Sequence, residues 1–127
     1  MSFVSPILRW LFFAAACTIL PLGAQNQFYM ETVAGKGQLY YDGDEIPADT
    51  AELYDPKGVF VEPTTKDVYI SDTSNRRVRL VEASTGIIYT IAGTGGGDYN
   101  GDDMLATSAT LAPSSVFVDP NTRNVYI

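Results

Sequence analysis

Short apolar runs separated by turn residues mark the middle of the chain as a series of β-strands. The runs are rich in Val, Ile, Tyr and Phe, which favour strands, and the segments between them contain Pro, Asp, Asn, Ser and Gly, which favour turns. This pattern predicts four antiparallel strands over residues 58–92, the arrangement of one blade of a β-propeller. The expected strands are Gly58–Glu62, Asp67–Ser71, Arg76–Glu82 and Ile87–Ala92.

Nearly all of this pattern occurs twice. "TVAG" at position 32 returns as "TIAG" at position 90, which is 58 residues later, and "GVFVEPTTKDVYI" at position 58 returns as "SVFVDPNTRNVYI" at position 115, which is 57 residues later. Self-similarity at a fixed period is typical of repeat architectures. We therefore expect Thr32–Gly35 to be the outermost strand of a preceding or closing blade, and Ser115–Ile127 to be the first hairpin of the next blade.

The segments between the predicted sheets belong to the same repeat. "YDGDEIPADTAEL" begins at Tyr41 and "YNGDDMLATSATL" begins at Tyr99, again 58 residues later, so neither segment is a linker between domains. Repeat units of this kind need about three or more copies to bury a continuous core. We therefore expect the natural reading frame to continue beyond Ile127, and residues 25–127 made alone to be aggregation-prone or loosely structured.

An apolar run near the N-terminus has the form of a secretory signal. One cation, Arg9, precedes "WLFFAAACTILPLGA", which ends in small residues, so we expect a signal peptide over residues 1–24 with cleavage after Ala24. A membrane anchor is the alternative, but the run is shorter than the 20 or so residues of a spanning helix, and Pro21 interrupts it. The mature domain is expected over residues 25–127 in a secreted or extracytoplasmic location, or anchored to the membrane if the signal is uncleaved.

The charge balance disfavours two classes of partner. The chain has 46% hydrophobic and 18% charged residues, as a globular protein does, and its formal net charge is −7, which becomes −8 when Arg9 is removed with the signal. Nucleic acids and anionic membranes attract basic surfaces, so we expect neither as a partner beyond the signal segment itself. The "RRVR" cluster does not change this, because the period of two places Arg77 and Arg79 on one face of the strand and Val78 and Leu80 on the other.

Taken together, these motifs resemble a known repeat. "GVFVEPTTKDVYISDTSNRRVRLVEASTGIIYTIAGTG", followed by "YNGDDMLATSATL" and a second "VFVDPNTRNVYI", is similar to the NHL repeat in its version with a long Y-x-G-D-x-x-x-A-x-x-A-x-L loop between blades. The resemblance covers about Glu31 to Ile127. It implies a β-propeller, usually of six blades, that serves as a protein or nucleic-acid interaction platform, although a few relatives with similar blades are lyases or hydrolases. One fold hosts many functions, so the resemblance does not fix the activity.

Three polar residues match a turn motif of this family, D-x-x-N-x-R. They are Asp72, Asn75 and Arg77. One interpretation is an exposed polar cluster at the end of a hairpin, available to a partner. The other, which we favour, is a structural turn in which Asp72 and Asn75 satisfy backbone groups and Arg77 adds a charged hydrogen bond.

The acidic loop offers weak candidates for a metal site. Asp98, Asn100 and Asp102 have the spacing with which calcium-binding loops begin, but an EF-hand loop then needs Gly at its sixth position and Glu at its twelfth. Those positions hold Asp103 and Ala109. We therefore expect a solvated acidic turn, with no metal and no other cofactor.

The residue inventory argues against catalysis. The chain has no His, its one cysteine, Cys17, lies in the expected signal peptide, and no G-x-S-x-G motif occurs, so the usual general base, thiol nucleophile and commonest zinc ligands are missing. We identify no catalytic or cofactor-binding residue and expect no enzymatic activity. The sequence favours a secreted or cell-surface module that binds a protein or glycan. The alternative is a metal-dependent gluconolactonase-like or strictosidine-synthase-like hydrolase or lyase whose site lies beyond residue 127.

Overall fold

The computed structural model of this protein describes residues 16–22 and 27–127, and these residues form strands joined by turns and two short 3-10 helices. The expected cleavage position after Ala24 lies outside the described residues, so the signal peptide stays a prediction. The elements are β1 (Ala16–Leu22), β2 (Gln27–Ala34), β3 (Ile46–Pro47), η2 (Ala48–Thr50), β4 (Gly58–Val61), β5 (Val68–Asp72), β6 (Arg77–Glu82), β7 (Ile87–Ala92), η3 (Ala106–Ser108), β8 (Phe117–Val118) and β9 (Val125–Tyr126).

The centre of the molecule is an antiparallel sheet with the strand order β3-β7-β6-β5-β4. Strands β4 to β7 follow one another in the sheet as they do in the sequence, because each pair is joined by a short turn. This confirms an all-β, antiparallel chain, and the four strands end within one residue of the expected bounds. Strand β3 was not expected. It adds two residues at the edge, where Ile46 faces Ile88 and Pro47 faces Ile87.

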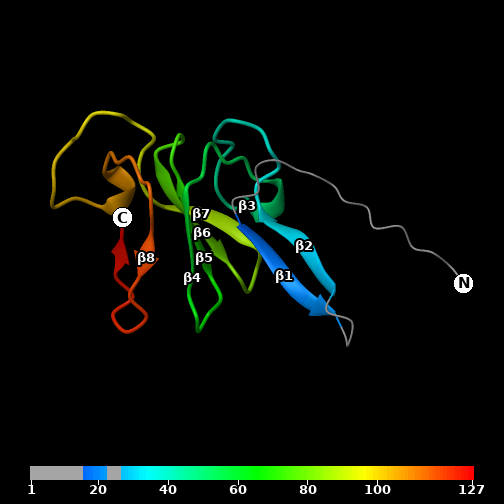
Figure 1. Cartoon of the computed structure of the whole chain (residues 1–127). Coiled ribbons are helices and arrows are strands. Elements are labelled where there is room, and N and C mark those ends of the chain that lie inside the picture. The colour runs from blue at the N-terminus through cyan, green and yellow to red at the C-terminus, as the bar shows by residue number, and fades with distance from the viewer. Residues whose placement is uncertain (1–15, 23–26) are drawn as a thin grey trace, which may run out of the picture.

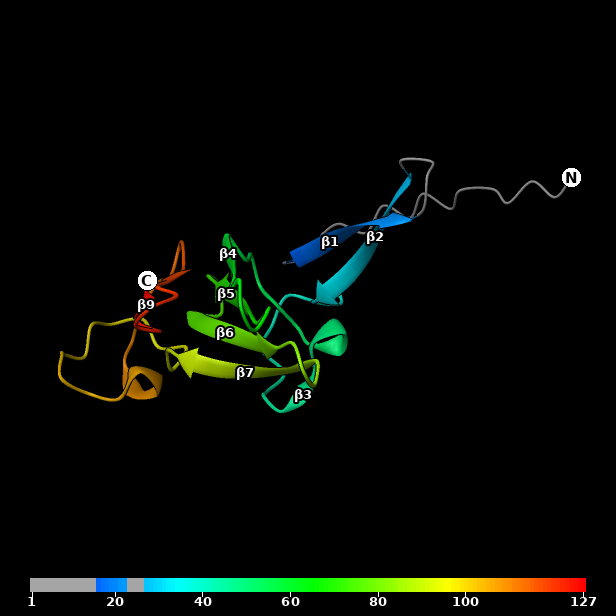
Figure 2. The same cartoon turned by 90° about the horizontal axis from the view of Figure 1, so that it is seen from below.

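Two hairpins lie on either side of this sheet (Figures 1 and 2). The hairpin β8-β9 begins and ends within the expected range Ser115–Ile127. The strand expected over Thr32–Gly35 is longer than the sequence indicated, since β2 runs from Gln27 to Ala34 and pairs with β1 in a separate two-stranded sheet. The repeat did not reveal this pairing, because residues 16–31 have no counterpart before β7.

Both faces of the central sheet are covered by apolar packing. Since side chains alternate along a strand, Val68, Ile70, Val81 and Ile88 point to one face, and Tyr69 and Val78 point to the other. The first face packs against β2, η2 and the loop that follows η2, through Ala34, Ala48, Ala51 and Leu53. The second face packs against the start of the next repeat, through Val116 and Val118. One repeat therefore buries its sheet against the next.

The two copies of the repeat share their backbone geometry. Gly35 and Gly93 have φ of 93° and 94°, and Gly43 and Gly101 have φ of 118° and 111°. Their hydrogen bonds also correspond: the amide of Gly35 donates to the carbonyl of Ala48 at 2.9 Å, and the amide of Gly93 donates to the carbonyl of Ala106 at the same distance. The repeat read in the sequence is thus a repeat in three dimensions.

Each hairpin turn is closed by a carboxylate at the same position of the repeat. Glu62 accepts hydrogen bonds from the backbone amides of Thr64 and Thr65, and its counterpart Asp119 accepts one from the amide of Asn121 at 2.8 Å. The hydrogen bond from the Thr65 amide is the largest cause of a lowered pKa of Glu62, and the one from Asn121 is the largest cause of a lowered pKa of Asp119. Because these bonds favour the charged forms, both turns depend on ionised carboxylates.

This dependence predicts a loss of stability in acid. A carboxylate whose pKa is lower in the folded chain stabilises the fold above its ordinary pKa, 4.5 for Glu62, and that stabilisation disappears as the pH falls through the lower folded value. We expect Glu62→Gln to lower the free energy of unfolding at pH 7 and to leave a flatter pH dependence below pH 4.5 than the parent chain has. Urea unfolding at steps between pH 3 and pH 7 measures both. The control is Asp49→Asn, which removes an exposed carboxylate far from the turn. Equal slopes for Glu62→Gln and the parent chain would contradict the prediction.

Candidate functional site

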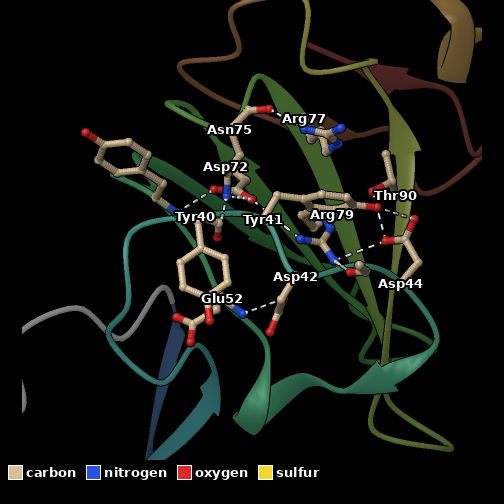
Figure 3. A network of polar contacts seen from close by, with 12 residues as sticks. Tyr40, Tyr41, Asp42, Asp44, Glu52, Asp72, Asn75, Arg77, Arg79 and Thr90 are labelled. Carbon is tan, nitrogen blue, oxygen red and sulfur yellow. Dashed lines mark hydrogen bonds and ion pairs between the residues drawn. The ribbon is translucent and has the colours of Figure 1, made fainter.

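The main polar cluster lies where the first long loop crosses β6, and its centre is the fully buried Arg79 (Figure 3). One guanidinium nitrogen of Arg79 donates to the carbonyl of Gly43 at 2.7 Å and to the carboxylate of Asp44 at 3.0 Å. The other terminal nitrogen lies 3.5 Å from the carboxylate of Asp72, which is also fully buried. Arg79 thus joins the loop to the end of β5 with two carboxylates.

Tyr41 adds an aromatic surface to this cluster. The guanidinium carbon of Arg77 lies 3.8 Å from the centre of the Tyr41 ring, and that of Arg79 lies 5.0 Å from it. A cation over a tyrosine ring is attracted by the negative face of the ring. The Tyr41 hydroxyl donates to Asp44 at 3.0 Å, and Thr90 of β7 donates to the same carboxylate at 2.9 Å. One tyrosine and one aspartate therefore hold two arginines that lie two residues apart on a strand.

The predicted turn residues also belong to the cluster. Asp72 accepts hydrogen bonds from the backbone amide of Tyr54 at 2.8 Å and from the side chain of Asn75 at 2.9 Å, and Asn75 also donates to the carbonyl of Tyr40 at 3.1 Å. Burial raises the pKa of Asp72, while these hydrogen bonds and the charge of Arg79 oppose the rise. The side chains are thus occupied by contacts within the chain, which tie the β5-β6 turn to the first loop.

Arg77 reaches towards the second loop as well as the first. Its guanidinium donates to the carbonyl of Asn75 at 2.8 Å and to the carbonyl of Thr94 at 2.7 Å. Thr94 lies at the start of the second loop, immediately after β7. Arg77 therefore connects the hairpin turn, the first loop and the second loop.

The sequence analysis was wrong about the surroundings of Arg79. Alternation places Val78 on one face and Arg79 on the other, and we expected the arginine face to be polar. Both residues are instead buried, because the first loop covers the face that Arg79 occupies, and the strand pairing shifts register between these two residues. The acidic and aromatic residues of "YYDGD", which contact Arg79, are the sequence signal that identifies the partner of the arginine.

A second polar contact fastens the first loop onto itself. Lys36 lies 3.1 Å from the buried carboxylate of Glu52 and 3.6 Å from Asp42, and its hydrogen bond with Glu52 is the largest cause of a raised Lys36 pKa. Glu52 also accepts the backbone amide of Gln38 at 2.7 Å, and Asp42 accepts the amide of Glu52 at 2.9 Å. These residues fix the shape of the loop.

The candidate calcium ligands are engaged in hydrogen bonds of the second loop. Asn100 donates to the carbonyl of Ser108 at 2.8 Å and accepts the amide of Thr110 at 2.9 Å, and Asp102 forms a hydrogen bond with Tyr99. In the described ranges, 16–22 and 27–127, no group of three or more Asp, Glu, His or Cys residues is arranged to hold a metal ion. The same ranges contain no apolar helix long enough to cross a membrane.

Exposed aromatic side chains surround the polar cluster on the loops. Tyr40 is 50% exposed, and Tyr54 and Tyr99 are also exposed. Tyr40 and Tyr54 lie close together, because Asn75 bonds the carbonyl of Tyr40 and Asp72 bonds the amide of Tyr54. Tyrosines with one apolar face and a polar tip are common in binding surfaces. We refer to Tyr40, Tyr54 and Tyr99 as the tyrosine surface.

Comparison with known proteins gives a likeness in fold. No family model matches this sequence, and no curated protein matches it. The crystal structure of an auxiliary nutrient binding protein from Bacteroides thetaiotaomicron is similar to this chain, with a TM-score of 0.60 and 21% sequence identity. The match covers 86% of this chain, which spans 28% of the length of that protein. At this identity the likeness concerns the fold alone, and it agrees with the all-β architecture described above.

Proposed function

We propose that this chain supplies blades of an NHL-type β-propeller and acts as an extracytoplasmic binding module without chemistry of its own. The observation that carries the proposal is the packing of one repeat on the next: Val116 and Val118 of the second copy bury themselves against Tyr69 and Val78 of the first. Propellers are built by radial repetition of four-stranded antiparallel sheets that pack in this way. The N-terminal signal pattern supports an extracytoplasmic location.

The partner that we propose is a protein or a glycan, bound at the loop end of the sheet. The structural neighbour is described as a nutrient binding protein, which favours a ligand-binding role over a catalytic one. The tyrosine surface supports the same role, because aromatic faces pack well against the apolar faces of sugars and side chains. The polar cluster beneath it is occupied by contacts within the chain, so it serves as a scaffold for the tyrosines.

A binding screen with a matched variant tests this function. We expect the folded 127-residue chain to bind at least one of starch, xylan, pectin or mucin saturably on a sensor surface. Tyr40→Ala should weaken that binding about tenfold, as loss of a central aromatic contact does. Tyr126→Ala, which removes a tyrosine of similar exposure, 55%, from the hairpin β8-β9, should leave it within twofold.

The alternative function has a separate outcome. A metal-dependent hydrolase or lyase would retain calcium or zinc in stoichiometric amounts after dialysis and would turn over δ-gluconolactone or p-nitrophenyl acetate. We expect no retained metal and no turnover above the buffer rate. Stoichiometric metal together with turnover would replace the binding module by this alternative.

A further inference from the structure

The two long loops of the chain share a shape but differ in what they hold. Glu45 and Asp103 both adopt left-handed backbone, with φ of 61° and 56°. The amide of Thr110 binds Asn100 at 2.9 Å, as the amide of Glu52 binds Asp42 at the same distance. Since both copies carry a tyrosine hydrogen-bonded to an aspartate three residues later, the second loop reproduces the first at the positions that hold arginine.

The first loop shows what this arrangement binds. Tyr41 and Asp44 hold the guanidinium groups of Arg77 and Arg79 through a ring contact at 3.8 Å and a charged hydrogen bond at 3.0 Å. Guanidinium groups suit such a site because they combine a flat face for the ring with donors for the carboxylate. The occupied copy is therefore a template for the ligand of the other.

The second copy has the same receptor groups without an arginine. Tyr99, the counterpart of Tyr41, is 74% exposed, and its hydrogen bond with Asp102 raises its pKa. Among the ion pairs of the described residues, none involves Asp102. In Figure 1 the yellow segment of this loop extends outward from the end of β7. The receptor groups of the second loop thus face solvent.

A strand edge lies beside the second loop. In the first copy, β5 pairs with β4 on one side and with β6, the strand that carries the arginines, on the other. In the second copy, β9 pairs with β8 alone. An unpaired edge offers backbone donors and acceptors to an added strand. The loop and the hairpin are also joined as in the first copy, because Leu111 packs with Val125 and Ala92 as Leu53 packs with Val68 and Ala34.

We propose that the second loop and the free edge of β9 form a docking site for an extended polypeptide strand that carries arginines two residues apart. The strand pairs with β9 as β6 pairs with β5, which is the β-augmentation mode of peptide recognition. Its arginines contact the ring of Tyr99 and the carboxylate of Asp102. The chain's net charge of −7 favours a basic partner at this site. The inference rests on the proposed function insofar as the module binds a polypeptide.

The test uses a strand that this protein already pairs with. A synthetic peptide of residues 74–83 contains Arg77 and Arg79, and a matched peptide carries citrulline, which is uncharged and of the same shape, at these two positions. We expect the arginine peptide to shift the amide NMR signals of Tyr99, Asp102 and Val125 in the labelled 127-residue chain. The signals of Tyr41 and Asp44 should stay in place, because that loop is occupied. The citrulline peptide should bind at least tenfold more weakly, since a charged hydrogen bond is lost.

Two variants of the chain separate specific docking from general attraction. Asp102→Asn should weaken binding of the arginine peptide about tenfold, because it removes the carboxylate that receives the guanidinium. Asp103→Asn removes the same charge from the next residue, and asparagine tolerates the left-handed backbone there, so binding should change less than twofold. Equal weakening by the two variants, equal binding of the citrulline peptide, or shifts confined to other regions would overturn the proposal. Such a failure leaves the polysaccharide and mucin measurements unaffected, so the two proposals fail separately.

Discussion

Replacing Arg79 with methionine is expected to lower the free energy of unfolding by about 3 to 5 kcal/mol, the cost of breaking a buried ion pair by removing one partner. Methionine has a similar length and fills the space, so the loss reports on charge. Asp72 is fully buried and would keep its carboxylate without the nearby guanidinium, and Asp44 would lose its contact with β6. Urea unfolding followed by circular dichroism measures the change.

The neighbouring Arg76 provides the matched control. Arg76 is exposed, and Arg76→Met removes the same charge from the same strand end, so we expect a change within about 0.5 kcal/mol. Adding Asp72→Asn to Arg79→Met should recover part of the lost stability, because the uncompensated charge is then gone. If the two arginine variants were equally stable, the buried pair would not be what fastens the loop to the sheet.

Alanine at Gly93 is expected to destabilise the chain by about 2 to 4 kcal/mol, from left-handed strain and steric overlap together. Gly93 has φ of 94°, and a Cβ at this position would lie 2.3 Å from the carbonyl oxygen of Arg76. That oxygen belongs to the backbone at the β5-β6 turn, so the overlap is relieved only by moving β7 away from β6. The measurement is the midpoint of urea unfolding at pH 7.

Gly86 separates the two causes. It also has a positive φ, 72°, but a Cβ there would meet no atom within 4 Å. Gly86→Ala therefore carries the backbone strain alone, about 1 kcal/mol. A Gly93→Ala variant as stable as Gly86→Ala would show that the close approach of Gly93 to Arg76 is not needed by the fold.

The strands of the central sheet followed from the sequence because each is defined by local chemistry. β-branched and aromatic residues fill β4 to β7, and the turns between them contain residues that favour turns. The repeat added long-range information that propensity alone lacks. It placed the hairpin β8-β9 and predicted that the two long loops are alike, as their hydrogen bonds and φ angles show.

Other elements were beyond the sequence because they depend on contacts between distant segments. Strand β3 is two residues long and contains Pro47, so no local pattern marks it, and it forms because Ile46 and Pro47 lie beside β7. The pairing of β2 with β1 is likewise a contact without a counterpart in the repeat.

The polar cluster was only half predictable for the same reason. The sequence determined that Asp72 and Asn75 occupy a turn, since their side chains bond backbone groups over short separations. It did not determine that Arg79 is buried, because alternation describes the two faces of a strand and says nothing about what covers each face. Only the tertiary structure decided that, by laying the loop of Tyr41 and Asp44 over β6, where two carboxylates and an aromatic ring compensate the arginine for the loss of water.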